Sequence, residues 1–205
     1  MNPCCSAAPQ TARSWLWRLL VFVTVVVPAQ ARLGEPSRVS EVPTAGAFPL
    51  VHHGRVAPLW VAGEDHPGVR RATRTLSEDI ARVTSYSAEV VEPGADAATG
   101  VPVVIGTLGR SPLIDQWVRE GKLDVAAISG RWEAFMHQVV EAPAPNIARG
   151  FVIVGSDPRG AIYGVYELSE QIGVSPWYWW ADVPARRRAA LHVAPTRHVD
   201  DGPVV

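Results

Sequence analysis

The chain has 205 residues, of which 47% are hydrophobic and 19% charged, and its formal net charge is −1. Acidic and basic residues are interspersed along it, which argues against a nucleic-acid partner. The length is enough for one domain with a core and short for most two-domain enzymes.

The first segment is predicted to be a secretory signal peptide. Arg13 and Arg18 precede an apolar run at residues 19–27, and Ala-Gln-Ala at residues 29–31 suits a cleavage site. A membrane anchor is the weaker alternative, because the run is well short of the roughly 20 apolar residues that cross a bilayer. Residues 1–31 are therefore expected to be removed on export, leaving a periplasmic or extracellular protein without a membrane attachment.

Both cysteines, Cys4 and Cys5, lie in this predicted signal peptide. Removal of 31 residues from 205 leaves a mature chain of 174 residues with no cysteine. Neither a disulfide nor thiol chemistry is then available, so stability in an oxidising compartment must come from packing.

The mature part divides by composition into three stretches. Residues 32–57 contain several prolines and glycines without a sustained apolar period, which predicts a flexible lead-in. A single domain is expected at residues 58–197. Residues 198–205 are interpreted as the start of a linker.

Three segments have the capping residues and the apolar spacing of amphipathic helices. Their ranges are 67–84, 112–120 and 158–172. Asp65 or His66 is placed to cap the first, Ser111 the second and Asp157 the third, each just ahead of a proline at the first helical position. Gly121 and Gly173 are placed to end the second and third helices.

Short apolar, β-branched runs predict the strands. They are residues 59–61, 88–91, 101–105, 132–140 and 151–154. The last two are expected to pair antiparallel around a loop at residues 143–150. Gly160 and Gly164, one turn apart in the third helix, indicate that another backbone packs closely there. The fold class is predicted as α/β (α+β), a mixed β-sheet with packed helices.

Three segments carry a family resemblance. They are residues 104–114 (VIGTLGRSPLI), 155–164 (GSDPRGAIYG) and 172–184 (IGVSPWYWWADVP). Together they resemble the N-terminal accessory domain of glycoside hydrolase family 115, over residues 58–197. The resemblance implies a xylan α-1,2-glucuronidase, which removes (4-O-methyl)glucuronic acid side chains from glucuronoxylan or a related plant polysaccharide.

The resemblance also implies where catalysis occurs. Members of this family continue into a catalytic (β/α)₈ barrel that holds the acid and base carboxylates, and an inverting glycosidase needs both. No position of this chain matches them, so no catalytic residue is assigned and the chain alone is expected to be inactive. The missing barrel is its expected intramolecular partner. A free-standing exported carbohydrate-binding module is the alternative.

Weak candidates for sugar binding are Arg159, Trp179, Trp180 and Asp182. Arg159 lies in the first turn of a predicted helix, where backbone amides attract carboxylates. Pairing with a nearby acid, or contact with the missing barrel, is the favoured interpretation. The aromatic run at residues 177–180 is read as extended, with alternate side chains on opposite sides. An interdomain contact is favoured over a sugar subsite, and exposure of this run predicts self-association.

No cofactor is expected. The six histidines lack the spacing of metal ligands, so no metal site is assigned. The glycines at positions 106 and 109 are not followed by the Gly-Lys-Ser/Thr of a phosphate-binding loop.

Overall fold

A computed structural model describes residues 1, 37–92 and 100–202. Apart from Met1, the predicted signal peptide lies outside the described residues, so its cleavage stays a prediction. Contacts divide the chain into two units, Met1–Glu35 and Pro36–Val205, and all the elements below belong to the second.

The domain is built on a six-stranded mixed sheet with the strand order β10-β7-β8-β6-β4-β5. The strands are β4 (Leu59–Val61), β5 (Val90–Val91), β6 (Val103–Thr107), β7 (Phe135–Ala144), β8 (Ile147–Gly155) and β10 (His198–Asp200). Strands β5, β4, β6 and β8 run parallel, whereas β7 is antiparallel to β8 and to β10. The predicted mixed sheet and its β7–β8 pair are confirmed.

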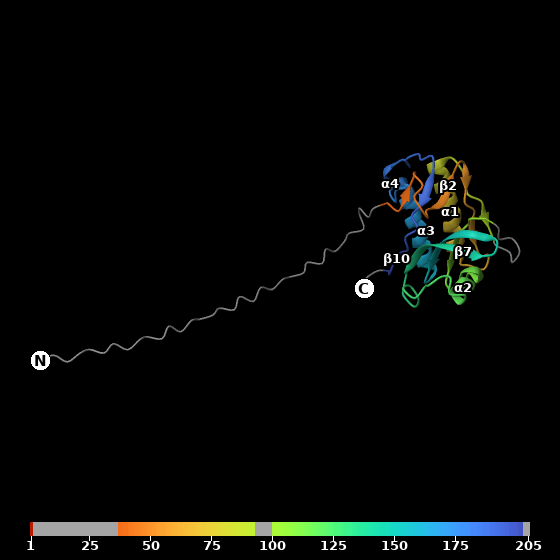
Figure 1. Ribbon diagram of the computed structural model, residues 1–205. Helices are drawn as coiled ribbons and strands as arrows, with labels where there is room; N and C mark the ends of the chain where they lie inside the picture. Colours follow the sequence, from red (N-terminus) through yellow and green to blue (C-terminus); the bar gives the residue numbers. More distant parts are fainter. Residues whose placement is uncertain (2–36, 93–99, 203–205) are drawn as a thin grey trace. The chain divides into compact units, whose positions relative to one another are not determined.

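Helices pack on both faces of this sheet (Figure 1). They are α1 (Pro67–Thr84), α2 (Pro112–Arg119), α3 (Pro158–Ile172) and the single turn α4 (Tyr178–Ala181). Apolar side chains of α1 and α3 enter one core, and those of α2 enter the other. The α+β fold and the three predicted helices are confirmed, with bounds within one residue of those expected.

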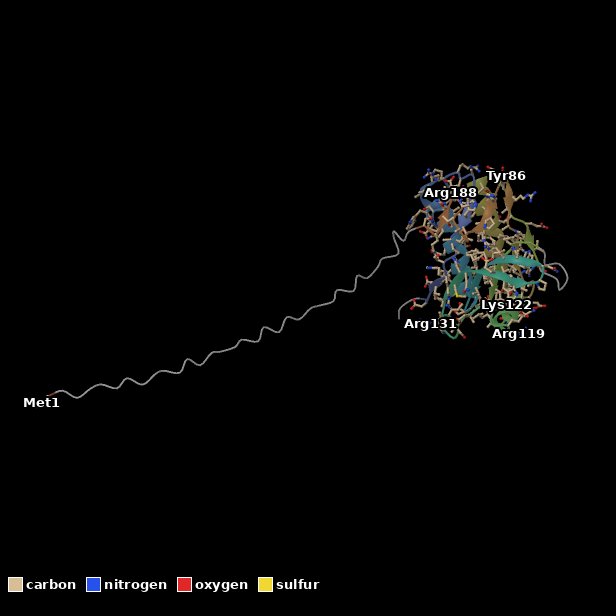
Figure 2. All side chains as sticks on the ribbon, in the orientation of Figure 1. Met1, Tyr86, Arg119, Lys122, Arg131 and Arg188 are labelled. Carbon is tan, nitrogen blue, oxygen red and sulfur yellow. The ribbon has the colours of Figure 1, made fainter. Side chains whose placement is uncertain are left out.

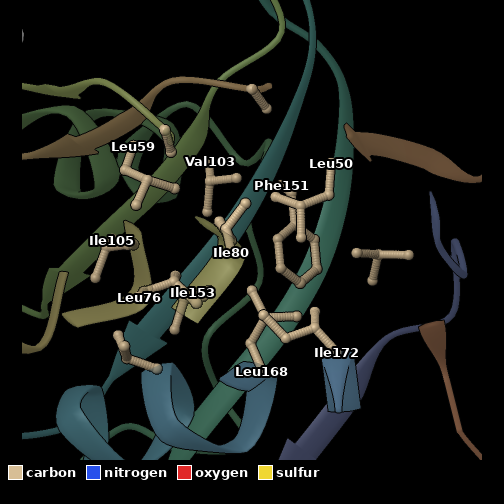
Figure 3. Close-up of a cluster of buried hydrophobic side chains, with 14 of the residues drawn as sticks. Leu50, Leu59, Leu76, Ile80, Val103, Ile105, Phe151, Ile153, Leu168 and Ile172 are labelled. Atoms are coloured by element: carbon tan, nitrogen blue, oxygen red, sulfur yellow. The ribbon is translucent and has the colours of Figure 1, made fainter. Parts of the chain in front are cut away.

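The core on the α1 and α3 side joins residues far apart in the sequence. In Figure 3, Leu50 and Phe151 lie near Leu168 and Ile172 of α3. Leu50 and Phe151 are fully buried or nearly so, and Phe151 also lies against Phe48, with ring centroids 5.6 Å apart. The segment before Pro58 therefore contributes to the main core.

This contribution corrects the predicted flexible lead-in. Residues 37–57 are ordered and form β1 (Val39–Ser40), β2 (Phe48–His52) and β3 (Arg55–Val56). With β9 (Leu191–Val193) they make a second sheet, in the order β1-β9-β2-β3. Gly46 and Gly54 lie in turns next to short strands, and Pro49 lies within β2 at a register shift. The pairing partner β9 lies about 140 residues further along the chain, where no local pattern could reveal it.

Two further boundaries differ from the prediction. Residues 198–200 form the edge strand β10, with His198 opposite His137, and so belong to the sheet and not to a linker. The loop expected at residues 143–150 is a hairpin instead, in which Ala144 pairs with Ile147. A register shift between Glu141 and Ala144 accommodates the prolines, which is how a strand tolerates a residue without a backbone N–H.

The helix N-caps lie where predicted, but of the three only Asp157 makes a side-chain capping hydrogen bond. Asp157 accepts a hydrogen bond from the Gly160 backbone N–H at 2.8 Å. Ser111 and His66 occupy the N-cap positions without a side-chain cap bond. A Cβ on Gly160 would lie 2.1 Å from the backbone oxygen of Ala134, which confirms the close approach. Gly164 instead faces the side chains of Ile153 and Phe135.

Candidate functional site

The carboxyl ends of β4 and β6 are the first place to look for a ligand. Strand β4 lies between β5, which follows it in the sequence, and β6, which comes next. Open α/β sheets commonly hold ligands at such a point, where successive connections leave a strand in opposite directions. Here Asp65 fills that crevice. Its carboxylate accepts hydrogen bonds from the Thr107 backbone N–H (2.8 Å), the Thr107 hydroxyl (2.9 Å) and the His66 backbone N–H (2.7 Å).

Asp65 is almost wholly buried, so these bonds close the crevice from inside. A carboxylate with three donors is satisfied and has little capacity left for a ligand. Asp65, one of two residues considered as the cap of the first helix, thus ties the start of α1 to β6.

Next along the same edge, β8 leads into α3 at Asp157. One carboxylate oxygen of Asp157 caps α3, and the other accepts from the Glu133 backbone N–H at 2.7 Å. Arg159 Nη1 donates to Glu133 Oε1 at 2.7 Å, and this bond raises the pKa of the Arg159 guanidinium. Its side chain is 72% exposed, and the favoured interpretation, pairing with a nearby acid, is what the geometry shows.

The aromatic run lies beyond the other end of α3, and its conformation corrects the prediction of an extended segment. Residues 178–181 form the helical turn α4, in which the Trp180 and Ala181 backbone N–H groups donate to the Trp177 carbonyl at 3.1 and 2.9 Å. Trp177 and Trp180 are three residues apart across this turn. These side chains are 64% and 85% exposed. The Trp179 side chain lies outside what the structure describes.

Tyr178 turns the other way, toward the body of the domain. Its ring stacks on the Arg82 guanidinium, whose Cζ is 5.2 Å from the ring centroid. Arg82 in turn pairs with Asp79, on the buried face of α1, and burial raises the pKa of the Asp79 carboxyl. Asp182 ends the turn with a left-handed backbone (φ +48°) and is exposed. Helix α1 thus anchors α4 through the contact of Arg82 with Tyr178, whereas Trp177 and Trp180 are exposed.

Three consecutive arginines follow at residues 186–188 and border the same end of α1. Arg187 Nη1 donates to the Ser85 hydroxyl at 2.7 Å, and the Arg188 backbone N–H donates to the Val83 carbonyl at 3.0 Å. Figure 2 labels Arg188 and Tyr86 in the upper part of the domain, and Arg188 bonds to the last turn of α1. Cations are favourable where helices end, because the last carbonyls carry partial negative charge. Arg186 is exposed and has no ion-pair partner within residues 37–92 and 100–202.

The four predicted sugar-binding residues therefore do not form one site. Arg159 lies in the first turn of α3, whereas Trp180 and Asp182 follow the other end of that helix. A helix of 15 residues is about 22 Å long at 1.5 Å per residue. One monosaccharide cannot span that distance.

A small pocket with a cavity volume of about 10 Å³, partly open to solvent, is lined by residues of both sheets and of α3. Its polar lining includes Arg38, His137, Gln171 and His198. Arg38 pairs with Glu167 through Nη2, while its buried Nε and Nη1 lack an acceptor. The volume is below that of ordinary ligand pockets, and a water molecule suffices to satisfy such donors.

The histidines are the remaining candidates for metal ligands. His52 Nδ1 and His192 Nε2 are 3.1 Å apart, a hydrogen-bond distance, and burial together with His53 and His192 lowers the pKa of His52. Over the described part of the chain, no group of three or more histidine, cysteine or acidic residues could hold a metal ion. Nor does any helix within residues 37–92 and 100–202 have the length and apolar character to cross a membrane.

Comparisons with known proteins show what the chain is similar to. No family model and no curated protein matches the chain. A solved structure, that of a family GH115 4-O-methyl-α-glucuronidase described as having specificity for decorated arabinogalactans, matches with a TM-score of 0.57 and 32% sequence identity. The match covers 70% of this chain and 17% of the neighbour. The chain is therefore similar in sequence and fold to an accessory part of a large GH115 glucuronidase.

Proposed function

We propose that this chain is the N-terminal accessory domain of a glucuronidase that removes (4-O-methyl)glucuronic acid side chains from plant polysaccharide, glucuronoxylan being the first candidate. The match to the GH115 glucuronidase carries the proposal. Unrelated proteins often share a fold without similarity in sequence. Here the match has 32% sequence identity over 70% of the chain, so it supports more than a shared fold.

On this proposal the chain releases no sugar by itself. Inverting hydrolysis needs a carboxylic acid and a carboxylate about 6.5–9.5 Å apart across the sugar. The acids at the carboxyl edge are engaged: Asp65 with Thr107, Asp157 with α3, and Glu133 with Arg159. These contacts support a binding or positioning role, with the catalytic pair supplied by a (β/α)₈ barrel.

The gene tests the proposal directly. Sequencing beyond codon 205 should reveal coding sequence that continues, in the same frame or after a frameshift, into a domain with two suitably placed carboxylates. A stop codon followed by unrelated sequence would contradict it. Purified chain incubated with 4-O-methylglucuronoxylan should liberate no uronic acid, and turnover abolished by Asp182→Ala would place a catalytic acid in this domain instead.

We also propose that the protein is exported, to the periplasm or beyond the cell. The basic residues, the apolar run and the Ala-Gln-Ala site support this. N-terminal mass spectrometry of the exported protein should find a chain that begins at or near Arg32. Recovery of exported protein still beginning at Met1 would remove the basis for the proposal.

A free-standing carbohydrate-binding module is the second candidate. The observation that favours it is the exposure of Trp177 and Trp180, since broad aromatic faces stack on sugar rings. A true stop at codon 206, together with glycan binding by the chain, would select this candidate over the first.

A further inference from the structure

We propose that the exposed face of α3 binds the same face of a second copy of this chain, with the two helices packed antiparallel around a twofold axis. This surface, called here the α3 face, consists of Arg159, Tyr163, Tyr166 and Glu170. The inference concerns a protein interface and does not depend on the proposed function.

The first argument is the position of these four residues on the helix. They follow one another at intervals of four, three and four residues, which places them in one line along an α-helix. The two tyrosines are nearly half exposed, at 45% and 47%, and Arg159 and Glu170 are exposed as well. The α3 face is therefore a continuous stripe that the domain itself does not cover.

The second argument is the contrast with α1, which packs beside α3 on the same side of the sheet. The exposed positions in the middle of α1 hold Arg71, Arg74 and Glu78, as is usual for a helix face in solvent. In α3 the middle of the stripe holds two tyrosines instead. Aromatic residues are enriched and charged residues depleted in the core of protein interfaces, with polar groups at the rim.

The third argument is the order of the charges, which selects a second copy as the partner. Arg159 comes four residues before Tyr163, and Glu170 comes four residues after Tyr166, so the spacing is the same from either end. In an antiparallel pair with twofold symmetry, Arg159 lies opposite Glu170 of the partner subunit, and Tyr163 lies opposite the partner's Tyr166. A different protein would need the reverse order of charges, whereas a second copy presents it by symmetry.

The fourth argument is that both charged groups have capacity for a partner. Arg159 donates to Glu133 through Nη1 only, and a guanidinium has five N–H donors. Among the residues that the structure describes, no cation forms an ion pair with Glu170. Partial burial and the neighbouring Glu167 raise the pKa of the Glu170 carboxyl. An arginine from the partner subunit would offset both effects.

The test is sedimentation velocity of the full chain over a series of concentrations. One helix face buries less than the roughly 800 Å² per partner of a standard interface, so we expect a reversible dimer with a dissociation constant of about 10–100 µM. Tyr163→Ala and Tyr166→Ala should each weaken this dimer about tenfold, because each substitution occurs twice in it.

Charge reversal tests the antiparallel pairing. Glu170→Arg would place two cations opposite each other, and Arg159→Glu would place two carboxylates opposite each other, so neither variant should dimerise where wild type does. The double variant restores opposite charges and should dimerise within about threefold of wild type. A double variant that keeps the wild-type circular dichroism spectrum but stays monomeric would overturn the inference.

Tyr86→Ala is the matched control, because Tyr86 is as exposed as Tyr163, at 45%, but lies past the end of α1. This variant should dimerise like wild type. Trp180→Ala tests the other exposed aromatic residues and should also dimerise. A chain that is monomeric at every concentration would overturn the inference, and so would a dimer that Trp180→Ala dissociates and Tyr166→Ala does not.

Discussion

The two ends of α3 contrast in how their polar groups are used. At its N-terminal end, along the carboxyl edge of the parallel strands, Asp65, Asp157 and Glu133 are each engaged by donors from neighbouring segments. Beyond its C-terminal end, Trp177, Trp180 and Arg186 are exposed. The acids at the edge where an open α/β sheet ordinarily holds its ligand are thus engaged within the domain, whereas these three side chains are open to solvent.

This contrast teaches that fold class is a poor guide to the position of a binding surface. The strand order alone would direct a search to the crevice between β4 and β6. The hydrogen bonds of Asp65 argue against a ligand there, because its carboxylate already accepts bonds from Thr107. Such a side chain stabilises the fold and has little capacity left to bind a ligand.

The strongest challenge to the closed edge is Gly160→Ala. Alanine in place of glycine within a helix ordinarily stabilises it by about 1 kcal/mol. Here the new Cβ would lie 2.1 Å from the Ala134 carbonyl oxygen, so we expect a loss of about 3 kcal/mol in the free energy of unfolding, measured with urea. Gly68→Ala is the control, since its Cβ meets only the flexible end of Ile162 at 3.0 Å. Stabilisation by Gly160→Ala would show that the backbones are not in contact.

Asp65→Ala tests the closure of the crevice itself. The buried Thr107 backbone N–H would lose its acceptor, and a buried unsatisfied donor costs about 1–3 kcal/mol. We expect a decrease of about 2 kcal/mol in the free energy of unfolding. Asp201→Ala, which removes an exposed carboxylate paired with Arg131, should change it little. Equal effects of the two substitutions would mean that Asp65 does not hold the edge together.

Low pH should destabilise the domain through His137, which contacts the middle of α3. His137 donates from Nε2 to the Gly164 carbonyl at 2.8 Å, and burial lowers the pKa of His137 to about 3. Between pH 6.5 and about 3 the unfolded chain binds a proton that the folded chain excludes, so stability falls as the pH falls. The slope contributed by His137 is about 1.4 kcal/mol per pH unit.

Urea unfolding of wild type and His137→Gln at pH 7, 5.5 and 4.5 measures this slope. Glutamine keeps a donor for Gly164 and does not titrate, so its curve should be flatter than that of wild type. Parallel curves for wild type and His137→Gln would contradict a neutral buried His137.

The smallest expected effect concerns Arg159. Its ion pair with Glu133 is mostly solvent-exposed on the arginine side, and exposed pairs contribute little. In dilute solution, where the chain is monomeric, Arg159→Gln should leave the unfolding midpoint in urea within error of wild type. A clearly lower midpoint would contradict this and show that the ion pair helps to hold the closed edge together.

Local patterns predicted the helices well and the aromatic run badly. The helix at residues 158–172 has its cap at Asp157, its proline at the first position and Gly173 as its left-handed end, all of which act over a few residues. The run at residues 177–180 is rich in aromatic residues, which favours an extended reading. Packing of Tyr178 on Arg82, about 100 residues earlier in the chain, accompanies a helical turn that no local signal announced.

By itself the sequence determined the helices, most strands of the mixed sheet and its antiparallel pair, because hydrophobic period and helix capping are properties of neighbouring residues. Tertiary structure alone decided that β2 pairs with β9, that Asp65 bonds to Thr107, and that residues 178–181 form a helical turn. Strand pairing and side-chain contacts join residues distant in the chain, so they follow from the packing of the whole domain and not from any local pattern.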